Sequence, residues 1–225
     1  MFKEWLALFQ NDSLMDRAYR RSSMMLDITL SMFLKAKTSL RYTDSDQVDI
    51  DIYDRDAEVN RYQREVRRHV FKHLTMRGVE RLPSGLVLVS IVINIERIGD
   101  YTKNMIELAM NHSGRLHGGK FETDLQRVET AVEDNFIRTK SCFESADEKT
   151  ALQLLKEYEW VSRVCDDCLF RLIKEDDKNI GSGDAVSLAL YFRWLKRINS
   201  HLRNISSSVV NPFDRIGFKP RPKKA

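Results

Sequence analysis

The chain has 225 residues, 42% of them hydrophobic, which is enough for one large domain or two smaller ones with apolar cores. It contains only nine glycines and four prolines, and three of the prolines come at or after Pro212. This scarcity of turn residues excludes a β-rich fold and favours long helices. The net charge of +4 lies in the last fifteen residues, which hold five basic residues and one acidic residue. The neutral remainder excludes the basic face of a nucleic-acid-binding protein.

The ends and the cysteines indicate a cytoplasmic protein. The first ten residues, MFKEWLALFQ, are too short and too acidic for a signal peptide, and no uninterrupted apolar run approaches the ~20 residues of a membrane span. Their aromatic side chains suit docking on a membrane or a partner, or packing within the protein or a dimer. The cysteines Cys142, Cys165 and Cys168 suggest no disulfide framework, and CDDC lacks the further ligands of a zinc site. Peripheral association with the inner face of the membrane stays open.

Six helices of similar length are expected in chain order. Apolar residues recur at helical spacing in each, and polar or glycine-containing breaks separate them. The sequence PSG at 83–85 is expected to complete the turn before the third helix. The expected helices are Leu14–Leu40, Asp51–Thr75, Leu86–Asn111, Phe121–Glu144, Lys149–Lys174 and Asp184–Val210.

A glycine-rich stretch divides these helices into two groups of three. Residues 113–120 contain Gly114, Gly118 and Gly119 and are taken as a linker. The predicted fold is all-α, with two tandem antiparallel three-helix bundles, 1–112 and 121–210, placed end to end. The basic residues 211–225 are expected to form a flexible tail.

The two bundles are related by an internal repeat. ERIGDYTKNM at 96–105 aligns with KRINSHLRNI at 196–205, where arginine, isoleucine and asparagine recur in register. DAEVNR at 56–61 aligns with YEWVSR at 158–163 at a similar offset. Two motif pairs in register indicate a repeated three-helix unit.

Acidic side chains follow the most hydrophobic segment of the chain. Glu96 and Asp100 are four residues apart and therefore share one face of a helix, as do Asp56 and Asn60 on the preceding helix. Such hard oxygen ligands on two antiparallel helices suit a metal ion. Ordinary surface ion pairs are the alternative, with Glu96 paired to Arg97 or Arg61 and Asp100 to Lys103.

These segments resemble a known family. ERIGDYTKNMIELA at 96–109 resembles the ERIGDxxxNIxE motif of the PhoU family, and DAEVNRY resembles that family's DxxVD/N motif. The resemblance implies a non-enzymatic cytoplasmic regulator of phosphate transport and signalling that binds a transporter subunit or a sensor histidine kinase. It also implies a divalent or trivalent ion at the first bundle, without distinguishing Mg, Mn, Fe and Zn. The implied ligands are Asp56, Asn60, Glu96 and Asp100, with Asn104 and Glu107 further along the same face.

The second bundle departs from this motif. Lys196 and Ser200 stand where the first bundle has Glu96 and Asp100, and Tyr158 and Ser162 replace Asp56 and Asn60. Because an ammonium group repels cations, one metal site is expected, in the first bundle. A divergent paralogue with another partner is therefore an alternative interpretation of this sequence.

Two other functions are open. A carboxylate-bridged metalloenzyme would use the same acids with an open coordination position, although the acids lack the histidines typical of di-iron bundles. A helical scaffold could have kept the bundles without regulating phosphate. Asp27, inside the first helix, is expected to form a salt bridge across the bundle, and a homodimer is also open.

Overall fold

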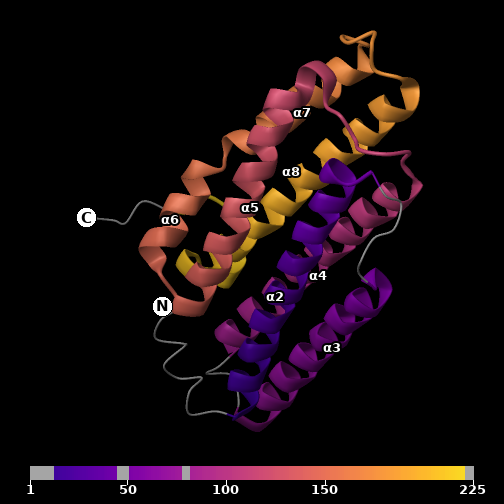
Figure 1. Cartoon of the computed structure of the whole chain (residues 1–225). Helices are drawn as coiled ribbons and strands as arrows, with labels where there is room; N and C mark the ends of the chain where they lie inside the picture. Colours follow the sequence, from indigo (N-terminus) through magenta and orange to yellow (C-terminus); the bar gives the residue numbers. More distant parts are fainter. Residues whose placement is uncertain (1–12, 45–50, 78–81, 221–225) are drawn as a thin grey trace.

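The computed structural model describes residues 13–44, 51–77 and 82–220, and the regular structure in these ranges is entirely helical (Figure 1). The elements are α2 (Ser13–Tyr42), α3 (Ile52–Arg77), α4 (Leu82–Asn111), the 3-10 helix η2 (Gly119–Phe121), α5 (Glu122–Ser145), α6 (Glu148–Glu157), α7 (Trp160–Ile173), α8 (Ser182–Val210) and the 3-10 helix η3 (Phe213–Arg215). The predicted all-α class is confirmed. The apolar N-terminal segment 1–10 lies outside the described residues.

Helices α2, α3 and α4 form the first bundle, and each contacts the other two. Met25 and Phe33 of α2, Val59 of α3, and Ile91 and Ile95 of α4 are buried in its core. Their spacing places them on one stripe of each helix, so burying these stripes drives the packing. Helix α4 begins at Leu82 rather than Leu86, and the predicted turn at 83–85 is therefore wrong. A proline costs little in the first turn of a helix, where its missing N–H has no intrahelical partner.

The second bundle repeats this plan with one interruption. Its first and last helices are α5 and α8, but the predicted helix 149–174 is divided into α6 and α7 at Tyr158–Glu159. Two carbonyls at the break accept hydrogen bonds from α8: Tyr158 O from Asn199 Nδ2 at 3.1 Å and Leu155 O from Arg203 Nη2 at 3.0 Å. These bonds replace the helical partners that a helix end lacks.

The two bundles lie side by side, not end to end as the sequence suggested. Helix α4 packs along α8, and α2 contacts α5, as Figure 1 also shows. The buried stripe of α4 is therefore shared between its own bundle and the other one. The expected salt bridge of Asp27 crosses this interface, with Lys140 Nζ of α5 2.6 Å from Asp27 Oδ1.

The glycine-rich segment and much of the C-terminal segment pack on the bundles. Leu116 is buried, and its N–H donates to Leu40 O at 2.9 Å. Beyond α8, η3 is followed by a turn in which Gly217 N donates to Ser207 Oγ at 2.7 Å. Gly217 has φ of +87°, a conformation that glycine adopts without strain. Residues 211–220, predicted to be part of a flexible tail, are thus folded against α8.

Helix α4 is long and apolar enough to cross a membrane by length and composition alone, and it is the single such helix among the described residues. Half of its most apolar window is buried inside the protein. Its central position between α2, α3 and α8 accounts for that composition.

Candidate metal site between helices α3 and α4

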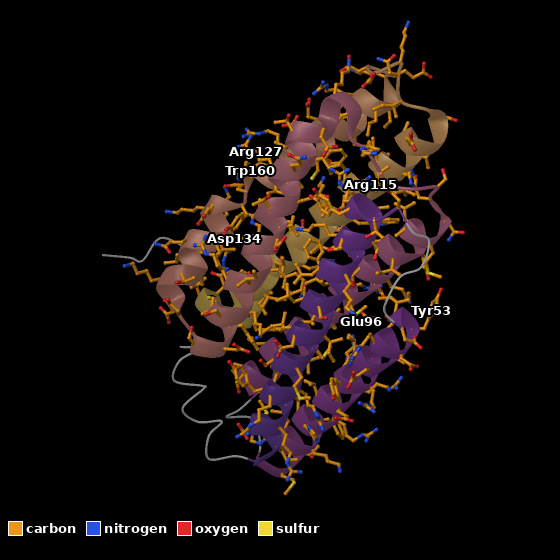
Figure 2. All side chains as sticks on the ribbon, viewed as in Figure 1. Tyr53, Glu96, Arg115, Arg127, Asp134 and Trp160 are labelled. Atoms are coloured by element: carbon orange, nitrogen blue, oxygen red, sulfur yellow. The ribbon has the colours of Figure 1, made fainter. Side chains whose placement is uncertain are left out.

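The predicted acids come together where α3 passes α4 in the first bundle. Asp56 and Asn60 lie one turn apart on α3, and Asn60 Nδ2 donates to Asp56 Oδ2 at 3.3 Å. Glu96 and Asp100 lie one turn apart on α4, and Glu96 is labelled in Figure 2. All four side chains are partly buried. Asp56 of α3 lies near enough to Glu96 of α4 for their charges to interact.

The pKa of Glu96 is raised by burial and by its acidic neighbours. Burial raises this pKa above its ordinary value, and the charges of Asp100 and then Asp56 raise it further, while Arg97 and Arg67 oppose the shift. A carboxylate that feels two other carboxylates gains from any cation placed between them. The raised pKa of Glu96 is thus due first to burial and second to the neighbouring carboxylates.

Two basic side chains already provide positive charge. Lys103 Nζ lies 3.2 Å from Asp56 Oδ2, and Arg97 Nη1 lies 3.0 Å from Asp100 Oδ2. Arg97 Nε is also 3.8 Å from Glu96 Oε2. The pKa of Lys103 is raised: burial lowers it, but the hydrogen bond to Asp56 and the nearby carboxylates outweigh burial. The expected pairing of Glu96 with Arg97 is present, whereas Lys103 binds Asp56 rather than Asp100.

The oxygen atoms of the four side chains are of the kind that a hard metal ion prefers. Two of the acids, however, already form ion pairs with Lys103 and Arg97. Carboxylate and amide oxygens are the ligands that Mg²⁺, Mn²⁺ and Fe ions accept. In the ranges that the structure describes, no three His, Cys, Asp or Glu side chains are grouped closely enough to hold an ion. For an ion to bind, Lys103 would have to leave Asp56, and its side chain, a quarter exposed, has solvent to move into.

The remaining candidates on α4 take other contacts. Glu107 Oε1 accepts from Tyr53 Oη at 3.4 Å. No hydrogen bond links Asn104 to the four acidic-site residues within the described chain. Gly99 does not face the acids: a methyl group there would lie 3.5 Å from Thr29 Cγ2 and 3.6 Å from Val59 Cγ1, in the core of the bundle. The suggested ligand face is thus limited to the first turn of the motif.

The equivalent positions of the second bundle form a different set of contacts. Lys196 Nζ lies 2.6 Å from both carboxylate oxygens of Asp166 on α7. Ser200 Oγ donates to Lys196 O at 3.0 Å, and Tyr158 Oη contacts Asp134 and Arg138. Both bundles thus pair an acid of the middle helix with a base of the last helix, but the second bundle lacks the additional acids of the first.

The thiols of the CxxC sequence are part of the core. Cys165 and Cys168 are buried, and burial raises the pKa of Cys165 to about 12 and that of Cys168 to about 11. Thiols with such pKa values are protonated at neutral pH and are poor metal ligands or nucleophiles.

Comparisons with known proteins agree with this architecture. The family model described as PhoU domain matches residues 23–109, the region of the first bundle that contains all four acidic-site residues. The resemblance to the PhoU family is confirmed there, and this part of the chain is a PhoU domain. No curated protein matches the chain in sequence.

Solved structures extend the likeness to the whole fold. PhoU from Pseudomonas aeruginosa superposes with a TM-score of 0.79 at 18% identity, covering 88% of this chain and 96% of that one. The phosphate transport system regulatory protein PhoU from Streptococcus pneumoniae gives 0.69 at 15% identity, covering 88% and 91%. Both bundles therefore have the PhoU fold.

Proposed function

We propose that this protein is a regulator or adaptor of phosphate transport and phosphate signalling, and not an enzyme. The observation that supports this most is the PhoU domain match over residues 23–109, which contains the acidic residues of α3 and α4. The fold of the entire chain, similar to that of the P. aeruginosa protein, is consistent with the proposal.

The acidic site is proposed to bind one divalent or trivalent metal ion. Asp56, Asn60, Glu96 and Asp100 would hold it, and the ion would supply positive charge where Lys103 now supplies it. Lys103 would then turn outward and leave Asp56 to the ion. Since the four ligands come from two helices, binding would fix α3 relative to α4 and stabilise that face for a partner.

The proposed partner is a subunit of a phosphate transporter or a sensor histidine kinase, met at the cytoplasmic face of the membrane. The outer face of α3 leaves room for such a partner, because α4 and α2 provide the main contacts to the second bundle, to α8 and α5. Homodimer formation is compatible with this role.

A capture experiment tests the function. The tagged chain is used to isolate proteins from its own cells grown in high and in low phosphate, with and without chelator. We expect a phosphate transporter subunit or a histidine kinase to be retained, in an amount that depends on phosphate. Retention of neither under both conditions, together with unchanged phosphate uptake in cells lacking the chain, would contradict the proposal and favour a scaffold without a role in phosphate regulation.

A further inference from the structure

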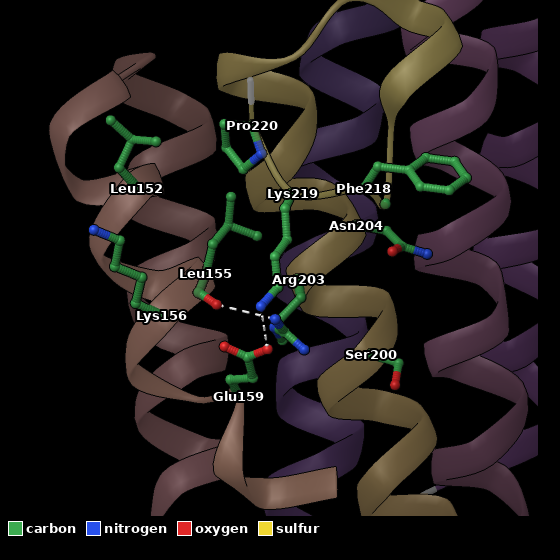
Figure 3. A pocket seen from close by; sticks show the side chains of 11 residues that line it. Leu152, Leu155, Lys156, Glu159, Ser200, Arg203, Asn204, Phe218, Lys219 and Pro220 are labelled. Carbon is green, nitrogen blue, oxygen red and sulfur yellow. Dashed lines mark hydrogen bonds and ion pairs between the residues drawn. The ribbon is translucent and has the colours of Figure 1, made fainter. Parts of the chain in front are cut away.

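A cavity of about 740 Å³ opens between α6, α8 and the C-terminal segment (Figure 3). Its size is that of sites for small organic ligands, which occupy roughly 300–1,000 Å³. Leu152 and Leu155 of α6 contribute to its apolar lining. Its polar lining comes from α6 and the break after it, from α8 and from the C-terminal segment: Lys156, Glu159, Ser200, Arg203, Asn204 and Lys219.

One side of the cavity lies next to the second-bundle positions that correspond to the acidic site. Ser200, Arg203 and Asn204 line it, and an offset of 100 in the repeat aligns them with Asp100, Lys103 and Asn104. At these three positions the second bundle lacks the acid of the first bundle but keeps the base and the asparagine. A base that is kept where the acid is lost favours a negatively charged ligand.

The C-terminal segment completes the cavity and is fixed by specific contacts. Asn211 Nδ2 donates to Phe218 O at 2.7 Å, and Lys219 Nζ lies 2.7 Å from Glu159 Oε1. With the Gly217 hydrogen bond to Ser207, these contacts hold the chain across the cavity. The position of Lys219 thus follows from the fold of residues 211–218.

The charges of the lining favour an anion. Three bases, Lys156, Arg203 and Lys219, face one acid, Glu159. Figure 3 shows the Arg203 guanidinium and the Lys219 ammonium next to each other, with Glu159 beside them. Lys156 forms no ion pair with the part of the chain that the structure describes. The lining has a surplus of two positive charges, which would balance the charge of about −2 on a phosphate monoester near neutral pH.

Arg203 has an unused hydrogen-bond donor. Its Nη2 donates to Leu155 O at 3.0 Å, but its Nε is buried and has no partner in the described chain. A buried charged donor without an acceptor is costly. Guanidinium groups match the oxygens of phosphate in a bidentate geometry, so a phosphoryl oxygen would satisfy this donor.

We propose that this cavity binds a small organic phosphate monoester, whose phosphoryl group is held by Arg203 and Lys219 and whose apolar part contacts Leu152 and Leu155. In the structure Glu159 is the internal anion bound to Lys219, and the ligand phosphate competes with it. This inference does not depend on the proposed role in phosphate regulation.

Calorimetric titration of the full chain with phenyl phosphate tests the site, with inorganic phosphate and benzoate titrated in parallel. We expect phenyl phosphate to bind more tightly than either, because it has both the dianionic group and the apolar part. Arg203→Gln should weaken its binding at least tenfold, and Lys219→Gln several-fold. Glu159→Gln should strengthen it, since the competing carboxylate is removed.

The exposed Lys178, outside the cavity, provides the matched control, and Lys178→Gln should leave binding unchanged. Circular dichroism checks that Arg203→Gln is folded, because Arg203 also caps α6. If this variant is unfolded, the affinities of Lys219→Gln and Glu159→Gln test the site. Absence of phenyl phosphate binding even to Glu159→Gln, equal binding of benzoate, or affinities unaffected by the cavity variants would overturn the proposal. A preference for inorganic phosphate over phenyl phosphate would overturn the assignment of an organic ligand.

Discussion

At the scale of single residues, Lys103 competes with a metal ion for Asp56, because it supplies the positive charge that an ion would supply. We predict that Lys103→Gln increases the affinity for Mn²⁺ several-fold. The partly exposed pair with Asp56 is expected to contribute at most about 1 kcal/mol to the metal-free protein, so the variant should remain folded. Calorimetric titration with Mn²⁺ measures the change.

The exposed Lys72 on the same bundle is the control for this substitution. Lys72→Gln removes the same charge without touching Asp56 and should leave the Mn²⁺ affinity nearly as it is. A gain equal in both variants would mean that overall charge, and not competition at Asp56, sets the affinity.

A second residue-scale prediction concerns His201, which lies between the bundles. Its Nδ1 is 2.9 Å from Asn94 Oδ1, and its ring stacks on Tyr101. Asn94 Nδ2 donates to Ser90 O, so Asn94 Oδ1 is an acceptor and the neutral histidine carries its proton on Nδ1. Burial, followed by the charges of Arg197 and Arg97, lowers the pKa of His201 to about 4.

Stability should therefore depend on pH through this residue. The unfolded chain takes up a proton below pH ~6.5 and the folded chain only near pH 4. The contribution is complete above pH ~6.5 and is lost as the pH falls towards 4, by up to about 3 kcal/mol. Urea unfolding at pH 7.5 and pH 4.5 measures the loss, and His201→Gln should reduce it. An equal loss in wild type and variant would assign the pH dependence to other groups.

At the scale of elements, two glycines of α4 have opposite roles. A methyl group at Gly99 would make ordinary contacts, whereas one at Gly85 would lie 2.9 Å from Val70 Cγ1 of α3. Gly99→Ala should stabilise the protein by about 0.5–1 kcal/mol, the helix-propensity difference between the two residues. Gly85→Ala should destabilise it by about 1–3 kcal/mol through overpacking.

Thermal unfolding of the two variants compares these effects directly, and each serves as the other's control. A clear loss of stability in Gly99→Ala would show that this glycine is needed for close packing or for the acidic site after all.

The helices were predictable from the sequence because each has its own apolar stripe. The break at Tyr158 was not, because its hydrogen-bond donors, Asn199 and Arg203, come from α8, far along the chain. The grouping of Asp56 with Glu96 could be inferred from spacing and from the family motif. The pairing of Lys103 with Asp56 depends on how α3 and α4 are placed, which spacing along one helix does not determine. The same limit explains why the side-by-side bundles were missed.

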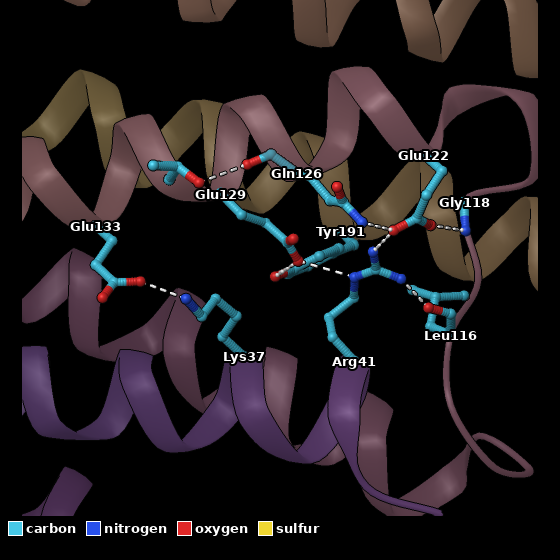
Figure 4. A network of polar contacts seen from close by, with 10 residues as sticks. Lys37, Arg41, Leu116, Gly118, Glu122, Gln126, Glu129, Glu133 and Tyr191 are labelled. Carbon is cyan, nitrogen blue, oxygen red and sulfur yellow. Dashed lines mark hydrogen bonds and ion pairs between the residues drawn. The ribbon is translucent and has the colours of Figure 1, made fainter.

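At the scale of the whole molecule, a buried charge network joins the bundles (Figure 4). Arg41 of α2 lies with its Nε 2.9 Å from Glu129 Oε1 of α5, and Tyr191 Oη of α8 donates to the same oxygen at 2.8 Å. Arg41 also contacts Glu122 and the carbonyl of Leu116. Arg41 and Glu129 are almost completely buried, so Glu129 depends on Arg41 for a cationic partner.

Replacing Arg41 should therefore destabilise the folded protein. Arg41→Met is predicted to lower the free energy of unfolding by about 3–5 kcal/mol, because it leaves Glu129 buried and unpaired. Adding Glu129→Gln to this variant should recover part of the loss. Urea unfolding measures both, and a loss in Arg41→Met that Glu129→Gln does not reduce would argue against the pairing as its cause.

We predict that the PhoU domain of residues 23–109 holds one metal ion between α3 and α4. Measurement of bound Mn²⁺ by mass spectrometry, after chelation and equilibrium dialysis, tests it on the wild type and on a Glu96→Ala/Asp100→Ala variant. We expect one ion per chain in the wild type and almost none in the variant. Equal metal content in the two proteins would contradict the assignment of the site.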